Sequence, residues 1–119
     1  MDSVGDSSEM LSRLMSAATL RAKVLSENIA NQNVPGYKRR VVRFEVLLAE
    51  HFSAGARSLD RVAPRIDVDT LTPSSPDGNN VNLEVETNAM RENALLYQLY
   101  AQILQTKYDM MDASIREGR

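Results

Sequence analysis

The residues that could perform chemistry are few and scattered. His51 is the only histidine, and it lies in the apolar stretch 44–52, where a structural role is the simpler interpretation. No nucleophile and orienting acid can be assigned to it at a recognisable spacing. The five glycines are dispersed, so there is no glycine-rich phosphate loop. The sequence therefore does not indicate an enzyme, and we expect neither catalytic residues nor a cofactor.

Two clusters of polar residues could bind ions. Asp67-Val68-Asp69 is followed by Asp77-Gly78-Asn79-Asn80, but the twelve-residue ligand spacing and the terminal glutamate of a calcium loop are missing. Lys38-Arg39-Arg40 follows Tyr37 and could bind phosphate or nucleic acid. The whole chain has 14 basic and 16 acidic residues, which does not favour a nucleic-acid partner. We interpret the first cluster as polar turns without a metal, and the cations as charges that face solvent or a neighbouring subunit.

The composition is that of one domain. The chain has 119 residues, of which 25% are charged and 43% hydrophobic, and these values indicate neither disorder nor a membrane protein. The absence of cysteine excludes disulfides and thiolate metal sites. No apolar run approaches the roughly 18–20 residues of a membrane span. Residues 1–6 lack an apolar core, so we expect no secretory signal peptide and, if the protein leaves the cytoplasm, another route of export.

The first element that must position these residues is a helix over residues 8–33. Apolar residues recur there at spacings of four and three, which places them on one face. Ser7 or Ser8 is suited to the N-cap. Pro35 disfavours the helical conformation of Val34 and should end the helix. The face comprises Leu11, Met15, Ala18, Ala22, Leu25 and Ile29.

A longer helix is predicted over residues 81–117. Neither Gly nor Pro lies between Gly78 and Gly118, and the apolar spacing alternates between four and three, as in a coiled coil. Such a helix is on the order of 50 Å long, too long for a compact domain of this size. The main stripe comprises Met90, Ala94, Tyr97, Ala101, Leu104, Tyr108, Met111 and Ile115, and a partial stripe beside it comprises Leu96, Leu99, Tyr100, Ile103 and Met110.

The middle of the chain has a different character. Residues 44–52 could form a helix or a strand, and a helix is the preferred interpretation. Residues 66–69 alternate apolar and polar, which favours a short strand, and Pro64 favours an edge position. Residues 72–80 have the composition of turns. The predicted fold is mainly α, with long N- and C-terminal helices that pack as a coiled-coil-like pair around a short, irregular or β-containing insert. The three parts, 1–37, 38–80 and 81–119, would form one elongated domain.

The apolar stripes are wider than one helix pair needs. Burying eight medium side chains contributes roughly 1.5–3 kcal/mol each, whereas ordering a helix of this length costs on the order of 1–2 kcal/mol per residue. The N-terminal helix can cover only part of the longer one. We therefore expect part of the stripes to pack on other subunits, and the free monomer to gain helix on assembly.

A turn ends the first helix. Val34-Pro35-Gly36-Tyr37 suits a type II turn, with proline second and glycine third, where φ is positive. This requirement explains the proline and the glycine. It does not explain the asparagines before the turn or the tyrosine and cations after it.

Those unexplained residues resemble a known signature. Asn28-Ile29-Ala30-Asn31 followed by Pro35-Gly36-Tyr37-Lys38-Arg39 is similar to the A-N-N-L-A-N, spacer, T-P-G-Y-K-R pattern of the bacterial flagellar rod and hook family. Glu27, Gln32 and Val34 depart from that pattern, and Val34 lacks the hydroxyl that commonly precedes the proline. The resemblance implies that the signature fixes the exit of the first helix and contacts adjacent subunits.

The C-terminal part carries a second signature. Residues 77–84 and 90–98 look like the D-G-N-N-V and E-N-A-x-x-Y-Q patterns of one proximal rod protein of this family, whereas its sister FlgC more often has a P-N-V-N run. The motif residues across both parts are Asn28, Ala30, Asn31, Pro35, Gly36, Tyr37, Lys38, Asp77, Gly78, Asn79, Asn80, Glu92, Asn93, Ala94 and Tyr97.

The resemblance implies a structural subunit of the rod that crosses the periplasm. Members of the family leave the cell through the flagellar type III export apparatus without a cleaved signal, and assemble helically to transmit torque. The implied partners are further copies, the rod subunits FlgC, FlgF and FlgG, the adaptor FliE, and the export gate with the MS-ring region. No nucleic acid or small-molecule substrate is implied. A FlgC-like axial protein and a stand-alone helical adaptor are the alternatives.

Overall fold

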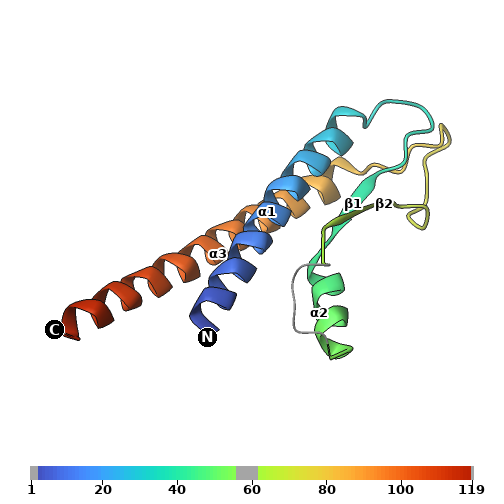
Figure 1. Ribbon diagram of the computed structural model, residues 1–119. Helices are drawn as coiled ribbons and strands as arrows, with labels where there is room; N and C mark the ends of the chain where they lie inside the picture. The colour runs from blue at the N-terminus through green and yellow to red at the C-terminus, as the bar shows by residue number, and fades with distance from the viewer. Residues whose placement is uncertain (1–2, 56–61, 119) are drawn as a thin grey trace.

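The computed structural model describes residues 3–55 and 62–118, and its long helices make it elongated, with extents of 68 × 29 × 15 Å. Its elements, in chain order, are α1 (Ser3–Ala30), β1 (Arg40–Arg43), α2 (Glu45–Ser53), β2 (Arg65–Val68) and α3 (Leu83–Glu117). Figure 1 shows α1 and α3 side by side, with the two-stranded sheet and α2 beside them. This confirms the predicted fold class. No helix within the described ranges is long and apolar enough to cross a membrane.

The first helix begins earlier than the sequence suggested. α1 starts at Ser3, so the prediction of an N-cap at Ser7 or Ser8 is wrong, and both residues lie inside the helix. Serine has a modest helix propensity and continues a helix where the flanking residues support it. The helix ends at Ala30, where the amide of Asn31 donates to the carbonyls of Glu27 and Asn28, each at 3.1 Å. The chain then turns through residues 31–36.

The predicted type II turn is present. The amide of Tyr37 donates to the carbonyl of Val34 at 3.2 Å, and Gly36 has a φ of 78°. A positive φ at the third position is the conformation that this turn requires and that glycine adopts without steric cost.

The second long helix matches its predicted bounds closely. Asn82 is the N-cap of α3, and its side-chain oxygen accepts hydrogen bonds from the amides of Glu84 and Val85 at 3.0 and 3.3 Å. Acidic residues in the first turn and Arg116 in the last turn complement the helix dipole. The helix has 35 residues against 28 in α1, about 52 Å at 1.5 Å per residue.

The middle segment forms the predicted helix and an antiparallel strand pair. α2 confirms the helical interpretation of residues 44–52. β2 pairs with β1 so that Arg40 faces Val68 and Val42 faces Ile66. Because the described sheet has only two strands, β2 is an edge strand. Pro64 precedes it directly, as expected.

A small apolar core fastens this segment to α1. Ala17 of α1 is fully buried against Phe44, Leu48 and Val62, with Met10, Leu14 and Leu47 partly buried around them. On the predicted stripe of α1, Leu11, Ala18 and Leu25 are buried, and Met15, Ala22 and Ile29 are half-buried. The apolar face of α1 therefore points inward along its length.

The face of α3 that lies against α1 is unexpectedly polar. Within the described residues of α3, only Glu86 and Asn93 are buried, seven residues apart, while Ala94 and Tyr97 of the predicted main stripe are exposed. Met90, Leu96, Tyr100, Ala101 and Leu104 are half-buried. From Tyr108 to the end of the described helix every residue is exposed, including Met111 and Ile115 of the stripe.

Two turns meet at glycines, and this contact generates a prediction. Gly78 has a φ of 87°, and a Cβ atom there would lie 3.3 Å from the Cα of Gly36. Gly55 also has a positive φ, of 90°, but nothing described lies within 4 Å of its Cβ position. We expect Gly55→Ala to lower the free energy of unfolding by about 1–2 kcal/mol, and Gly78→Ala to lower it by a further ~1–3 kcal/mol because the methyl group overpacks the contact. Urea denaturation of both variants measures the difference, and equal losses would contradict the close approach.

Candidate functional site

A group of polar side chains, which we call the clasp, joins the end of α1 to the sheet and to the start of α3. It consists of Asn28, Arg39, Asp69, Asn80 and Glu86. Its members come from α1, from the segments that flank β1 and β2, from the approach to α3 and from α3 itself. Together they connect every part of the described fold except α2.

Asn28 lies at the centre of the clasp and is fully buried. Its amide nitrogen donates to the carbonyl of Arg40 at 2.8 Å and to Glu86 Oε1 at 2.9 Å. Its side-chain oxygen accepts from the amide of Arg40 at 2.9 Å and from the hydroxyl of Tyr37 at 3.1 Å. An asparagine side chain has two donors and two acceptor positions, so this residue is fully satisfied. The Asn28 side chain thus bonds the backbone of β1 at the edge where the described sheet has no further strand.

Glu86 carries the buried charge of the clasp. Its side chain has no exposed surface, and a buried carboxylate is costly unless it is paired and hydrogen-bonded. Arg39 supplies the pair, with Nε 2.7 Å from Oε2 and Nη2 3.3 Å from Oε1. The remaining nitrogen, Nη1, donates to Asp69 Oδ2 at 2.8 Å. One guanidinium thus binds a carboxylate of α3 and a carboxylate at the end of β2.

The electrostatics of this pairing favour the charged forms. The Thr72 hydroxyl and the Arg39 guanidinium hold the pKa of Asp69 well below its usual range, with the amides of Thr72 and Leu71 adding to the effect. For Arg39, burial opposes the charge, but hydrogen bonds from its side chain to Glu86 and Asp69 outweigh burial and raise the pKa. Asp69 and Arg39 therefore stay ionised at neutral pH.

The asparagine pair before α3 ties the two turn regions together. Asn79 donates to the carbonyls of Asn31 and Val34 at 2.9 and 2.8 Å. Asn80 accepts the amide of Arg39 at 2.7 Å and donates to the carbonyl of Asp69 at 2.8 Å. Both side chains are buried. The second signature thus folds onto the first.

A second polar cluster lies further along the helix pair. Arg21 Nη2 donates to Glu45 Oε1 at 2.6 Å, and its Nη1 donates to Asn93 Oδ1 at 3.1 Å. Asn93 also donates to the carbonyl of Ala18 at 2.7 Å. Burial opposes the charge of Glu45, but its contact with Arg21 outweighs burial and lowers the pKa, while burial and the nearby Glu45 raise the pKa of Tyr100. Tyr100 closes the cluster by donating to Glu45 Oε2 at 3.2 Å.

These contacts correct the interpretation of Arg39 as a charge that faces solvent or a neighbouring subunit. For Lys38 and Arg40, contact with a neighbouring subunit stays a prediction. Arg39 is not a charge that faces solvent, because its side chain is 14% exposed and lies between two carboxylates. Lys38 donates to Ser74 and to the carbonyl of Gly78, while Arg40 is exposed. Of the motif residues, Glu92, Ala94 and Tyr97 are also exposed, and no contact within residues 3–55 and 62–118 explains them.

Sequence reasoning missed three residues that the structure shows to be central, Arg21, Glu45 and Glu86, and it interpreted Asp69 only as part of a polar turn. All four bond across the fold. For Glu86 a signal existed, because it lies seven residues before Asn93 and fourteen before Tyr100, on one heptad line of α3. A search for apolar residues alone does not detect this line, because Glu86 and Asn93 are polar.

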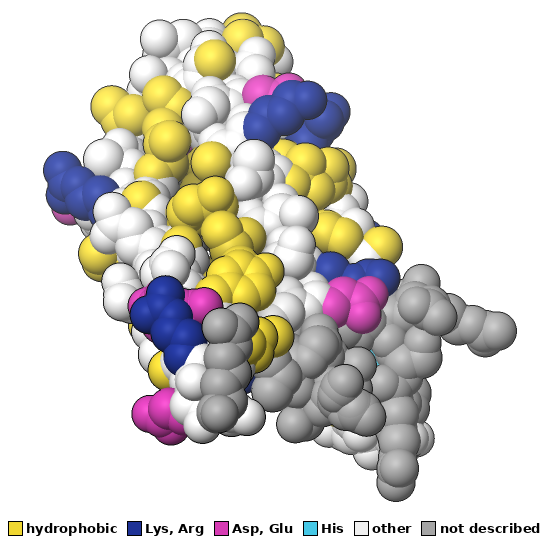
Figure 2. All heavy atoms as spheres, turned by 60° about the vertical axis from the view of Figure 1, so that its left-hand side comes forward, with side chains coloured by type: hydrophobic (Ala, Val, Ile, Leu, Met, Phe, Trp, Pro, Cys, Tyr) yellow, Lys and Arg dark blue, Asp and Glu magenta, His cyan; other side chains and the backbone are white. Residues whose placement is uncertain are grey.

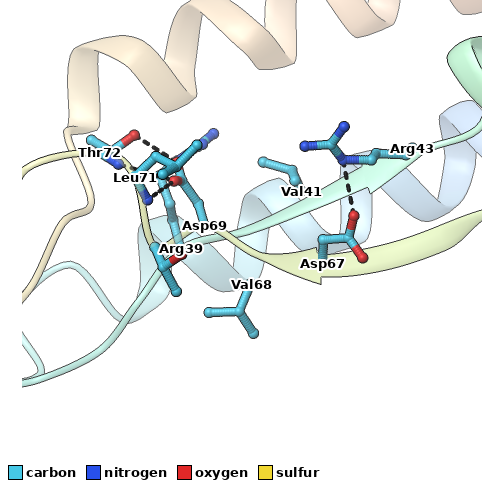
Figure 3. A pocket seen from close by; sticks show the side chains of 9 residues that line it. Arg39, Val41, Arg43, Asp67, Val68, Asp69, Leu71 and Thr72 are labelled. Atoms are coloured by element: carbon cyan, nitrogen blue, oxygen red, sulfur yellow. Dashed lines mark hydrogen bonds and ion pairs between the residues drawn. The ribbon is translucent and has the colours of Figure 1, made fainter.

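A pocket of about 700 Å³ lies along the sheet and is lined by residues of both strands and of the turn after β2. Figure 3 shows Arg43 and Asp67 directed at each other, joined by a contact of 2.9 Å, with Val41 and Val68 on opposite sides of the sheet. Arg39 and Asp69, at its other end, are paired as described above. The charges at this pocket therefore neutralise one another, and the arrangement does not suit a phosphate.

The exposed surface of α3 has a different chemistry. In Figure 2 the C-terminal end of α3 is turned forward, and hydrophobic side chains cover much of the visible face. We call the following exposed apolar set the outer face of α3; its members are between 38% and 67% exposed: Leu95, Leu99, Ile103, Tyr108, Met110, Met111 and Ile115. At 3.6 residues per turn the set covers two sides of the helix. Tyr108, Met111 and Ile115 continue the line of Tyr100 and Leu104, and the other four lie on the opposite side. Large apolar side chains gathered in this way mark an interaction surface more often than a solvated one.

Comparison with known proteins identifies relatives of this chain. A family described as "Flagella basal body rod protein" matches residues 12–38, which span most of α1 and the signature turn. The flagellar basal body rod protein FlgB of Aeromonas hydrophila is 33% identical over 105 residues, covering 78% of this chain and 80% of that relative. This chain belongs to the FlgB family of flagellar basal body rod proteins.

Other FlgB relatives extend over most of the chain. FlgB of Bacillus subtilis (strain 168) is 26% identical over 119 residues, with 92% of each chain covered. FlgB of Salmonella typhimurium is 28% identical over 102 residues, covering 71% of this chain and 74% of that relative. As a FlgB-family protein, the chain is a structural subunit of the basal body rod. The matched segment ends at Lys38, so it includes Asn28, the centre of the clasp.

Loss of the clasp arginine should destabilise the fold. In Arg39→Met the buried Glu86 keeps only its bond from Asn28, and leaving a buried charge without its partner costs about 3–5 kcal/mol. Arg40→Met removes the same charge from the next position, where the side chain is exposed, and should cost no more than about 0.5 kcal/mol. Thermal or urea unfolding of both variants tests this, and similar losses in the two would refute the role of Arg39.

The lowered pKa of Asp69 predicts a dependence on pH. Because its pKa is depressed in the folded state, its contribution is fully present above the unfolded value of about 3.9 and is lost as the pH falls below it. We expect Asp69→Asn to be less stable than the parent chain at pH 7, and the gap to narrow as the pH is lowered from about 4. Denaturation curves at several pH values measure the gap. A gap that stays constant down to pH 2 would count against the ion pair.

Proposed function

We propose that this FlgB-family chain is a subunit of the proximal part of the rod, where it assembles helically and transmits torque. The observation that carries the proposal is the outer face of α3. Its large apolar side chains are unpartnered within the described chain, and they continue over the last turns of α3, where every residue is exposed.

The predicted stripe of α1 and the predicted stripes of α3 would serve different purposes. The stripe of α1 is largely buried within the chain, so it serves the fold. The outer face of α3 is left for neighbours, together with Tyr97 and the half-buried Leu104. Contacts between different faces of identical or similar subunits build open helical structures rather than closed dimers. A face that runs along a helix of about 52 Å is long enough to touch more than one neighbour.

The clasp fits the mechanical role. A subunit transmits torque only if its own elements keep their relative positions under load. Side-chain pairs with bidentate geometry and full hydrogen bonding fix one arrangement more specifically than apolar contact does. The bonds of Arg39 and Asn28 would therefore hold α1, the sheet and α3 as one body while the outer face of α3 exchanges force with neighbours.

Family membership and the proposed surface support the following partners and location. The partners would be further copies, FlgC, FlgF, FlgG, FliE, and the export gate with the MS-ring region. The rod would carry the subunit through the periplasm, after export by the flagellar type III apparatus. No catalytic step is part of this role, and the paired charges of the clasp are used to hold the fold.

A charge on the free end of α3 should prevent assembly without unfolding the subunit. Ile115 is 61% exposed and belongs to the proposed surface, so Ile115→Asp leaves the chain's own contacts intact but buries a carboxylate at the interface. In a strain that lacks the native gene, we expect the variant to be expressed with unchanged helical content and to give the non-motile phenotype of the deletion. Motility in soft agar is the measurement.

The matched control is Gln105→Asp, which adds the same charge at an exposed site on the side of α3 that carries no member of the apolar set. It should keep most of the motility. Normal motility in Ile115→Asp, or equal loss in both variants, would exclude this face of α3 as the assembly surface.

A further inference from the structure

Among the residues that the structure describes, none bonds the backbone groups on the outer edge of β2. The register pairs Val41 with Asp67, and the ladder continues where the amide of Asp69 donates to the carbonyl of Arg39 at 2.8 Å. Bonded and non-bonded pairs alternate along an antiparallel ladder. Since Arg39 and Asp69 bond, Asp67 bonds as well, and the amides and carbonyls of Ile66 and Val68 point away from β1.

The opposite edge of the sheet is filled. The same alternation turns the backbone of Arg40 and Val42 toward α1. There the side chain of Asn28 bonds both backbone groups of Arg40, and Arg21 Nη2 lies 3.4 Å from the carbonyl of Val42. At β2, in contrast, Ile66 is 46% and Val68 53% exposed. The part of the chain that the structure describes therefore has one open edge.

We propose that β2 binds β2 of a second copy, antiparallel, about a twofold axis at Ile66. The backbone of Ile66 would bond that of Ile66 in the second copy, and the amide of Val68 would donate to the carbonyl of Pro64. Two exposed isoleucines would meet on one face. On the other face Arg65 would lie opposite Asp67, twice by symmetry. Asp67 already pairs with Arg65 and Arg43 of its own chain, at 3.0 and 2.9 Å. Arg65 of the second copy would join these charges, and opposite charges on facing residues stabilise a strand pair.

Charge selects this register and this partner. Centring the pair on Asp67 opposes that carboxylate with its own copy, and centring it on Val68 opposes Asp67 with Asp69. Like charges on facing residues are destabilising. A foreign strand would have to offer the same spacing of acid and base, whereas a second copy offers it by symmetry.

The proposed strand pair is small, so the dimer should be weak. The experiment must therefore detect a weakly populated dimer. Four residues on each side bury far less than the roughly 1,200 Å² of a stable interface. Covalent trapping is the suitable readout, and the chain has no native cysteine to interfere.

The test uses the full-length chain with Ile66→Cys, and with Val68→Cys as the control. In the proposed register the two Cα atoms at position 66 are about 5.5 Å apart, within the range of a disulfide. The two atoms at position 68 are four residues apart along the ladder, about 14 Å. We expect Ile66→Cys to form disulfide dimers at least about tenfold faster under mild oxidation. Equal rates would overturn the pairing, and dimers formed only in a mixture of the two variants would overturn the register.

A charge exchange tests the same pairing independently. In the Ile66→Cys chain, Arg65→Asp or Asp67→Arg alone should slow dimer formation, because each makes the facing charges alike. A mixture of the two should restore the rate through a mixed dimer whose charges oppose again. Restoration on mixing cannot come from recovered folding, and its absence would refute the proposal. Both tests use the isolated chain, so they are independent of its role in the rod.

Discussion

A carboxylate with no exposed surface constrains everything around it. Glu86 is placed one turn into α3 and faces α1, where water cannot solvate it. Such a charge is tolerated only with a counter-ion and hydrogen bonds in good geometry. Arg39 must therefore come to it from one side and Asn28 from another. Once they do, the exit of α1, the start of β1 and the entry to α3 are fixed relative to one another, and the turns between them have to follow.

The clasp also explains why the signature residues are spaced as they are. Asn28 reaches β1 only because the type II turn reverses the chain within a few residues, and Asn80 reaches Arg39 only because Gly78 lets its turn approach Gly36 closely. Polar contacts of this kind add modest net stability, since each replaces a bond to water. What they add is a single allowed arrangement of the elements. The apolar side chains on the outer face of α3 remain free for other contacts.

Periodicity was enough to predict the architecture but not the site. The stripes located both helices, and the proline and glycine located the turn, because those signals depend on local geometry. The start of α1 was misplaced, since serine at a helix start and serine within a helix are alike in sequence. The inward line of α3 escaped detection because Glu86 and Asn93 count as surface residues in any hydrophobic pattern. Their burial depends on partners 47 to 75 residues away in the chain, and no local pattern in the sequence reveals such pairs.

The side chain of Asn28 has a further consequence for how the sheet can grow. A strand pair with two open edges can recruit strands on both sides and extend without limit, which is the route to fibrils. Here one edge is occupied by side chains of α1 that imitate a strand. Any pairing at the other edge therefore ends after a single addition, because the incoming copy also presents a closed edge on its far side. A subunit kept at high concentration before it is incorporated would thereby be protected from open-ended aggregation through its sheet.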